Sequence, residues 1–183
     1  MVYKITNGEL NENCYILSNG DNCVVIDPGY AYEQIIEYTK RNNIKILAVL
    51  LTHGHFDHSK SGYKLQKLGI PIYIHKDDAD KLYTDNNLSN LIGAHFDYYH
   101  ANILIEEGKL CIGEFCFDVI HTPGHSKVSV SYIYKDNIFC GDTLFKNGYG
   151  RYDFYDGNYY DLMKSVKKLL KYKKEGCKFF YGH

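Results

Sequence analysis

The chain has no tryptophan, no long apolar run and no excess of charge of either sign. No apolar stretch approaches the roughly 18 residues of a membrane-spanning helix. Residues 1–10 also lack the basic start and apolar run of a signal peptide, so we expect neither a membrane span nor a secretory leader. The formal net charge of -1 gives no general attraction to nucleic acid or anionic lipid, and neither is an expected partner.

The cysteines show no C-x-x-C spacing and are scattered through segments that we predict to be strands. Disulfide frameworks are typical of small secreted domains, whereas cytoplasmic proteins keep their thiols reduced. We therefore expect reduced thiols throughout and a cytoplasmic location. The residues concerned are Cys14, Cys23, Cys111, Cys116, Cys140 and Cys177.

What remains is an ordinary globular composition, with 45% apolar and 23% charged residues. A chain of 183 residues is long enough to bury about two thirds of its unfolded surface in one domain. No internal repeat, linker or shift in composition divides it. We therefore predict a single domain over residues 1–183.

Short β-rich runs alternate with helical patterns along the chain. We predict strands over 1–6, 13–19, 22–27, 44–52, 70–75, 110–120, 128–134, 137–141 and 177–183. We predict helices over 31–42, 60–69, 76–83 and 159–174, a loop or broken helix over 84–102, and a loop over 145–158. This order favours two packed sheets with helices on their outer faces.

The segment "LLTHGHFDHS" at 50–59 gathers titratable groups directly after an apolar run of strand length. Alternation of side chains after the strand would place His53 and His55 on one side, and Asp57 and His58 follow once the chain turns. Imidazoles and carboxylates are ligands of first-row transition metals. This spacing therefore predicts that one short loop serves two metal ions.

Three further candidate ligands follow later apolar strands. His125 follows the Pro-Gly turn of "HTPGHS", Asp142 follows the strand in "IFCGDTLF", and His183 ends "KFFYGH". Ligands that repeatedly stand at strand ends are typical of a site at one edge of a β-sandwich. The seven candidates together are enough for a dinuclear centre, with Asp57 and Asp142 as the candidate catalytic residues.

These motifs, in the order "NENCYIL", "VVIDPG", "LLTHGHFDHS", "HTPGHS", "GDTLF" and a terminal "GH", resemble those of the metallo-β-lactamase superfamily. Within it, the chain is similar to small hydrolases of the glyoxalase II (hydroxyacylglutathione hydrolase) type. The resemblance implies an α/β fold, an αββα four-layer sandwich. It also implies that His53, His55 and His125 hold one metal, that Asp57, His58 and His183 hold the other, and that Asp142 bridges them.

The implied activity is hydrolysis of a small acyl-thiol, a thioester such as a hydroxyacylglutathione, by a hydroxide shared between two divalent cations. We expect zinc, with iron or manganese accepted by the same ligands. One alternative is a mononuclear iron persulfide dioxygenase, which shares the H-x-H-x-D-H motif. Another is a metal-stabilised scaffold without activity. A nuclease is disfavoured because no basic stripe accompanies the site. The oligomeric state is left open.

In glyoxalase II the loop after the bridging aspartate carries a Lys and a Tyr that contact glutathione. The matching positions here hold Arg151 and Asp153. Arg151 could grip a substrate carboxylate, or it could pair with Asp153 and brace the loop. We include Lys146 and Tyr149 as further candidate substrate contacts. The C-terminal helical domain of glyoxalase II is not present here, so the chain could be shortened at its C-terminus.

Other polar residues receive supporting or structural roles. Asp27 in "VVIDPG" is predicted to support the histidine loop from outside the ligand set. We expect His75 to be exposed, and His121 to support the site from outside the ligand set or to have a packing role, rather than to bind metal. The segment 84–102, with His95 and His100, is a candidate lid over the site. The lysines of the helix at 159–174 are predicted to form a solvated face.

Overall fold

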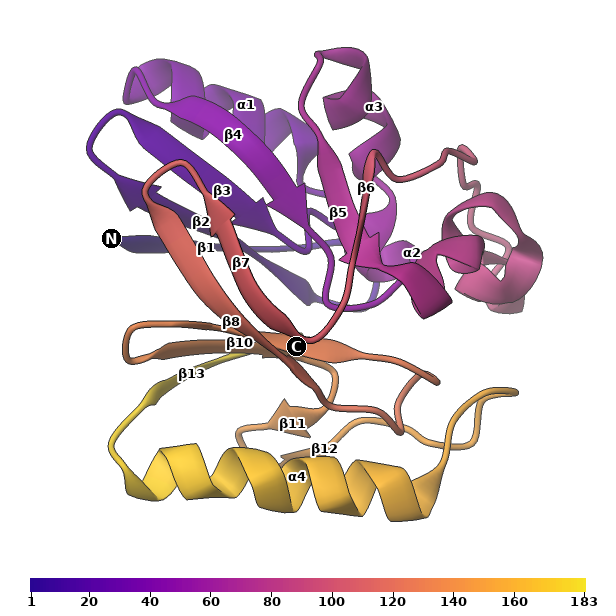
Figure 1. The fold of residues 1–183 in the computed structure, drawn as a ribbon. Helices are drawn as coiled ribbons and strands as arrows, with labels where there is room; N and C mark the ends of the chain where they lie inside the picture. The colour runs from indigo at the N-terminus through magenta and orange to yellow at the C-terminus, as the bar shows by residue number, and fades with distance from the viewer.

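A computed structural model describes all 183 residues, and the chain in it folds into two β-sheets that face each other (Figure 1). The larger sheet is formed by the first half of the chain, and its strands lie in sequence order. The first three strands are antiparallel, and the strands from β3 to β6 are parallel. This sheet contains β1 (Val2–Asn7), β2 (Glu12–Asn19), β3 (Asn22–Ile26), β4 (Lys45–Leu50), β5 (Ile72–His75) and β6 (Ile103–Ile105).

The second sheet has five strands in the order β13-β10-β9-β8-β7. Its neighbours are antiparallel except for β13, which runs parallel to β10. The strands are β7 (Gly108–Ile112), β8 (Phe115–His121), β9 (Val130–Tyr134), β10 (Asn137–Gly141) and β13 (Lys178–Tyr181). A small separate hairpin pairs β11 (Leu144–Phe145) with β12 (Gly148–Tyr149).

Helices cover the outer faces of both sheets (Figure 1). Helices α1 (Tyr32–Arg41) and α3 (Gly62–Lys67) lie over the first sheet, and α4 (Tyr159–Lys174) lies over the second. Shorter helical segments follow β4 and β5. These are α2 (Phe56–Ser59) and the 3-10 helices η1 (Lys76–Tyr83), η2 (Asp85–Asn87) and η3 (Ser89–Leu91). None of the helices is both long and apolar enough to cross a bilayer.

Alternating side chains of the strands produce three apolar layers. In β2, Tyr15 and Leu17 face the second sheet, where they join a cluster that includes Phe117, whereas Ile16 faces the helices with Ile35 of α1. A third cluster packs the outer face of the second sheet against α4. Helix, sheet, sheet and helix therefore follow one another, and the predicted αββα four-layer sandwich is confirmed.

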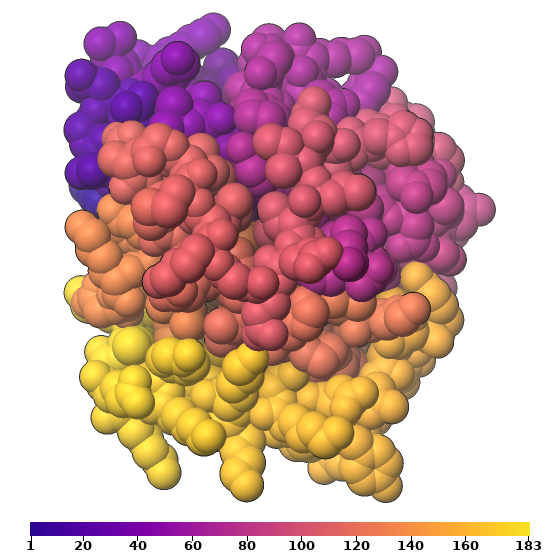
Figure 2. Space-filling model, viewed as in Figure 1, coloured from indigo at the N-terminus to yellow at the C-terminus, as the bar shows by residue number.

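The two halves of the chain occupy separate halves of the molecule. In the space-filling view the indigo and purple residues lie at the top and the yellow residues of α4 lie at the bottom (Figure 2). Each sheet is thus built largely from one contiguous part of the sequence. A site that uses ligands from both sheets therefore lies where the two halves meet.

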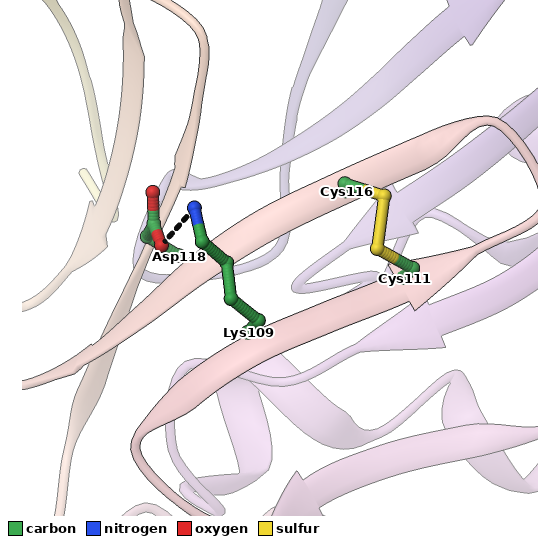
Figure 3. The surroundings of a disulfide bond; sticks show 4 residues. All are labelled: Lys109, Cys111, Cys116 and Asp118. Carbon is green, nitrogen blue, oxygen red and sulfur yellow. Dashed lines mark ion pairs between the residues drawn. A yellow bond between two sulfur atoms is a disulfide. The ribbon is translucent and has the colours of Figure 1, made fainter.

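The predicted strand over 110–120 is in fact a hairpin of β7 and β8, with a two-residue turn at Gly113 and Glu114. The turn places Cys111 directly opposite Cys116, and the two form a disulfide with their Cα atoms 4.1 Å apart (Figure 3). The prediction of reduced thiols is therefore wrong for this pair. The other four cysteines are free, as predicted.

The prediction that His75 is exposed is also wrong, because His75 is only 2% exposed. It ends β5, where its Nε2 lies 2.8 Å from Nε2 of His121 at the end of β8. Its Nδ1 accepts a hydrogen bond from the backbone N–H of Asp77. The pair links the ends of two strands that belong to different sheets, and His121 takes the packing role predicted for it.

Candidate metal centre

The histidine loop leaves the end of β4 and turns at once into α2. His53 and His58 are fully buried, and His55 and Asp57 are nearly so. The turn needs Gly54, because a Cβ at that position would lie 2.6 Å from Cβ of Lys81. One short segment therefore carries four donor groups into the junction between the sheets.

The three later candidates arrive from the second sheet. His125 follows the turn after β8, Asp142 follows β10, and His183 follows β13. Two backbone hydrogen bonds hold the segment that carries His183: Gly182 N–H donates to Gly141 O (2.9 Å), and Asn13 N–H donates to Gly182 O (2.7 Å). The second bond joins the end of the second sheet to β2 of the first.

All seven predicted ligands lie together. Nδ1 of His55 is 3.0 Å from Nε2 of His125, and Nε2 of His58 is 3.3 Å from Oδ1 of Asp142. Nε2 of His183 lies 3.4 Å from Oδ2 of Asp57 and 3.3 Å from Oδ2 of Asp142. Donor atoms lie within 4.8 Å of one another in three groups: His53, His55 and His125; His53, His58 and Asp142; and Asp57, His58 and His183.

Three of the donor atoms that point inward lack hydrogen-bond partners. Nε2 of His53, Nε2 of His58 and Oδ1 of Asp142 are buried and unpaired. Buried polar atoms without partners are costly, and proteins rarely leave several of them in one place. Nitrogens and carboxylate oxygens at these spacings fit divalent transition-metal ions, which would satisfy all three atoms.

The outward nitrogens of the same rings are hydrogen-bonded, and these bonds fix the tautomers. Nδ1–H of His58 donates to Oδ2 of Asp27 (3.1 Å), and Nδ1 of His53 lies 3.0 Å from Oγ1 of Thr52, whose hydroxyl donates to the same Asp27 oxygen. In the neutral form of both rings, Asp27 therefore leaves the inward nitrogen without a proton, as a metal ligand requires. The contact agrees with the supporting role predicted for Asp27.

Two more ligand rings are held by backbone carbonyl groups. Nδ1–H of His125 donates to Arg151 O (2.8 Å), and Nδ1–H of His183 donates to Leu10 O (2.9 Å). In each case Nε2 faces the cluster, whereas His55 presents Nδ1. Four of the five imidazoles are thus locked in one tautomer by groups outside the ligand set.

Without a cation, the carboxylates hold protons on two of the histidines. Burial opposes the charging of His58 and His183, but Asp142 and Asp57 outweigh it. The pKa of His58 is raised well above its usual value, and that of His183 is raised to about 10. Although burial alone would raise it, the pKa of Asp142 is held well below its usual range by the same imidazoles.

The other two histidines of the loop behave in the opposite way. Burial and the adjacent imidazoles lower the pKa of His53 and His55 well below the usual value. Their nitrogens are therefore neutral at pH 7 and available as metal ligands without loss of a proton.

A buried ion network behind the loop was not foreseen. Nζ of Lys81, which is 1% exposed, lies 2.6 Å from Oδ1 of Asp78 and 2.7 Å from Oδ2 of Asp156. The other oxygen of Asp78 accepts a hydrogen bond from Gly54 N–H (2.6 Å). The network thereby braces the turn between His53 and His55. Its only sequence signal was the acidic run "KDDADK", which a solvated helix start explains equally well.

A cavity of about 480 Å³ opens onto the cluster. Five of the seven candidates line it, whereas His53 and His58 lie behind them. The remaining lining residues are Leu10, Phe56, Leu88, Leu91, Ile92, Phe145, Arg151 and Phe154. A small molecule that enters the cavity therefore meets both carboxylates and three imidazoles at its floor.

The predicted substrate contacts occupy different places. Arg151 lines the cavity and forms a two-point ion pair with Asp153 (2.8 and 2.9 Å), so the bracing contact considered for it is present. Its contact with a substrate carboxylate stays a prediction. Lys146 and Tyr149 are exposed at the β11–β12 hairpin and do not line the cavity. Their contact with substrate stays a prediction.

The segment 84–102 borders the cavity through Leu88, Leu91 and Ile92. His95 and His100 of the same segment are exposed and lie outside the cavity lining. The segment therefore forms a wall of the cavity with its aliphatic side chains rather than with its histidines.

A family model described as the metallo-beta-lactamase superfamily matches residues 7–183. The chain belongs to this superfamily. It is 37% identical over 183 residues to the probable metallo-hydrolase YqgX of Bacillus subtilis, covering 96% of this chain and 86% of that protein. It is 32% identical over 169 residues to hydroxyacylglutathione hydrolase 1 of Vibrio vulnificus, covering 92% of this chain and 60% of that protein.

Solved structures of the superfamily superpose closely on the structure of this chain. The BLEG-1 B3 metallo-beta-lactamase has a TM-score of 0.90 and 35% identity, covering 100% of this chain and 91% of that one. A di-iron-bound form of TTHA1623 has a TM-score of 0.88 and 31% identity, covering 99% and 91%. The resemblance read from the motifs is confirmed, and the buried His/Asp cluster is a candidate metal site in a metallo-hydrolase superfamily.

Asp27→Asn should weaken metal binding about 10–100-fold, because the asparagine amide would donate to Nδ1 of His58 and move its proton to the inward nitrogen. The affinity is measured by competition with a chromogenic chelator, and circular dichroism checks that the fold persists. An unchanged affinity would show that the tautomer of His58 does not control the site.

Metal binding should release protons, because the cations must replace those on His58 and His183. Apparent affinity should therefore rise with pH until the pH passes the pKa of His183, about 10, and should fall in acid. Calorimetric titration of the metal-free protein in buffers of different ionisation enthalpy should report about two protons released at pH 7. The absence of net proton release would contradict the proposed apo state.

Gly182→Ala should reduce metal affinity at least about tenfold, because the new Cβ would lie 1.9 Å from Oδ1 of Asp142. The matched control is Gly176→Ala, where the added methyl group meets open space but φ is +87°. This control should cost ~1 kcal/mol of stability without lowering metal affinity. Equal affinities for the two variants would contradict the close contact at Gly182.

Proposed function

We propose that the protein is a dinuclear metal-dependent hydrolase of thioesters. The observation that carries this proposal is the position of the cavity, whose floor is formed by five of the seven converging donors. Two bound divalent cations would supply Lewis acidity, lowering the pKa of water and polarising an acyl carbonyl group. His53, His55 and His125 would hold one cation, and Asp57, His58 and His183 the other.

Asp142 would serve both halves of the centre. Its Oδ1 faces His58 at 3.3 Å, and its Oδ2 lies 3.5 Å from Nε2 of His125 and 3.3 Å from Nε2 of His183. Asp142 and Asp57 are the two carboxylates that line the cavity. We assign them the task of orienting the attacking water and accepting its proton.

The cavity contains no further acid that could protonate a leaving group. Beyond the candidate ligands, its only titratable lining residue is Arg151, which stays protonated. A thiolate leaves without strong proton donation, because the pKa of a thiol is only about 8.5. An alkoxide or amide leaving group would need a proton. The lining therefore favours a thioester over an ester or a peptide.

The relationship to hydroxyacylglutathione hydrolase 1 of Vibrio vulnificus supports the thioester class. It does not carry glutathione over to this chain, which spans 60% of that protein. Zinc is our expectation for the metal, and the di-iron form of TTHA1623 keeps iron open as well. The cytoplasmic location also stays a proposal.

The test measures metal content and activity on one preparation. Metal-loaded protein should bind about two ions per chain and hydrolyse an S-acyl thiol. Treatment with a chelator should abolish the activity, and added metal should restore it. His55→Ala should reduce kcat/KM at least about 100-fold. The control His95→Ala removes an imidazole whose side chain is 82% exposed and should leave activity unchanged.

Other results would identify the alternatives. One iron per chain together with oxygen uptake on a persulfide would replace the hydrolase by a dioxygenase. Metal binding without turnover of any thioester, ester or lactone would favour a metal-stabilised scaffold.

A further inference from the structure

The rim of the cavity is aliphatic and exposed. Leu10, Leu91 and Ile92 line the cavity and remain 45%, 67% and 44% exposed. Large apolar side chains that gather at a concave site and stay open to water usually mark a surface that binds something. They come from two segments that are far apart in the sequence: Leu10 lies between β1 and β2, and Leu91 and Ile92 lie at the end of η3.

Both segments of the rim are held in place. The turn that carries Leu10 accepts the hydrogen bond of His183 through the Leu10 carbonyl oxygen (2.9 Å). On the other side, the fully buried Asn87 accepts from Ser89 N–H (2.8 Å) and donates to Thr84 O (2.9 Å). The rim is therefore preorganised, which lowers the entropy cost of binding.

Leu88 in this turn has φ of +69°, a conformation that costs energy for a residue with a side chain. Its side chain lines the cavity, and the chain then continues to Leu91 and Ile92. Strained residues of this kind cluster at ligand sites, where surrounding contacts impose them. The strain at Leu88 is a second observation that points to this wall as part of a binding site.

Charge on the rim is almost absent. Arg151 is the only charged lining residue outside the candidate ligands, and Asp153 already neutralises it. The Arg151 guanidinium also lies over the ring of Phe154, 4.6 Å from its centroid. A glutathione moiety carries two carboxylates and an ammonium group, and the rim offers no free partners for them.

We propose that the cavity selects thioesters whose acyl chain is uncharged and apolar, and that Leu91 and Ile92 determine this preference. The inference rests on the proposed thioesterase function. The acyl chain and the thiol are both bonded to the reacting carbonyl carbon, so either group lies within reach of the cavity wall. The aliphatic side chains of Leu91 and Ile92 suit an apolar acyl chain. A cavity of about 480 Å³ accommodates such a chain.

The reaction balances with water alone. Water adds to the acyl carbon and forms a C–O bond, the C–S bond breaks with its electron pair on sulfur, and the products are a carboxylate, a thiol and a proton. No oxidant or second substrate is needed.

The test compares S-acetyl- and S-hexanoyl-N-acetylcysteamine, which share one neutral thiol, with S-D-lactoylglutathione. The kcat/KM for hexanoyl should exceed that for acetyl about tenfold. Leu91→Asn and Ile92→Asn should each lower this ratio about fivefold. Leu104→Asn is the matched control, since Leu104 is 58% exposed on β6 and does not line the cavity, and it should preserve the ratio.

A ratio that neither rim variant changes would overturn the inference, as would a kcat/KM that is highest for lactoylglutathione. If no thioester is hydrolysed, the proposed function fails, and binding decides the inference separately. Metal-loaded protein should then bind hexanoate at least about tenfold more tightly than acetate, and Leu91→Asn should remove the difference. Equal binding of the two carboxylates would refute an apolar chain site.

Discussion

Imidazole nitrogens and carboxylate oxygens lie close together at the junction of the two sheets. The protein alone does not supply a partner for each of these buried groups. Nε2 of His53, Nε2 of His58 and Oδ1 of Asp142 are buried without hydrogen-bond partners, and without a cation the carboxylates raise the pKa of His58 and His183. Removing such groups from water is costly unless each is paired. Divalent cations would remove that cost, and the donor set fits them.

Residues outside the cluster hold its donor groups in place. Asp27, itself bonded to Thr52, sets the tautomers of His58 and His53, and the Lys81 network braces Gly54 between His53 and His55. Two backbone bonds at Gly182 join the chain end to both sheets. A ligand set held from outside stays close to its metal-binding geometry before metal arrives, which lowers the reorganisation cost of binding.

Sequence reasoning located the candidate ligands because they form short motifs at strand ends, and strand ends meet at sheet edges. It missed features that depend on register or on distant packing. Cys111 and Cys116 face each other only because the turn at Gly113 makes one predicted strand into two. Lys81 is buried because Asp156, 75 residues later, reaches it. The aliphatic rim was missed for the same reason, since Leu10 and Leu91 meet only in three dimensions.

Two of the hydrogen bonds around the centre come from backbone groups of the cavity wall, whereas the side chains of the same wall face the cavity. Leu10 and Arg151, two residues of the cavity wall, hold the candidate ligands His183 and His125 through backbone carbonyl oxygens. Their side chains can therefore change without altering the bonds that orient the metal ligands. Leu91 stands on a segment that contributes no ligand at all. Relatives with the same ligand set can thus differ in the molecule they accept, and the motif alone does not identify the substrate. That information lies in the loops of the rim, where this chain presents aliphatic groups and one neutralised arginine.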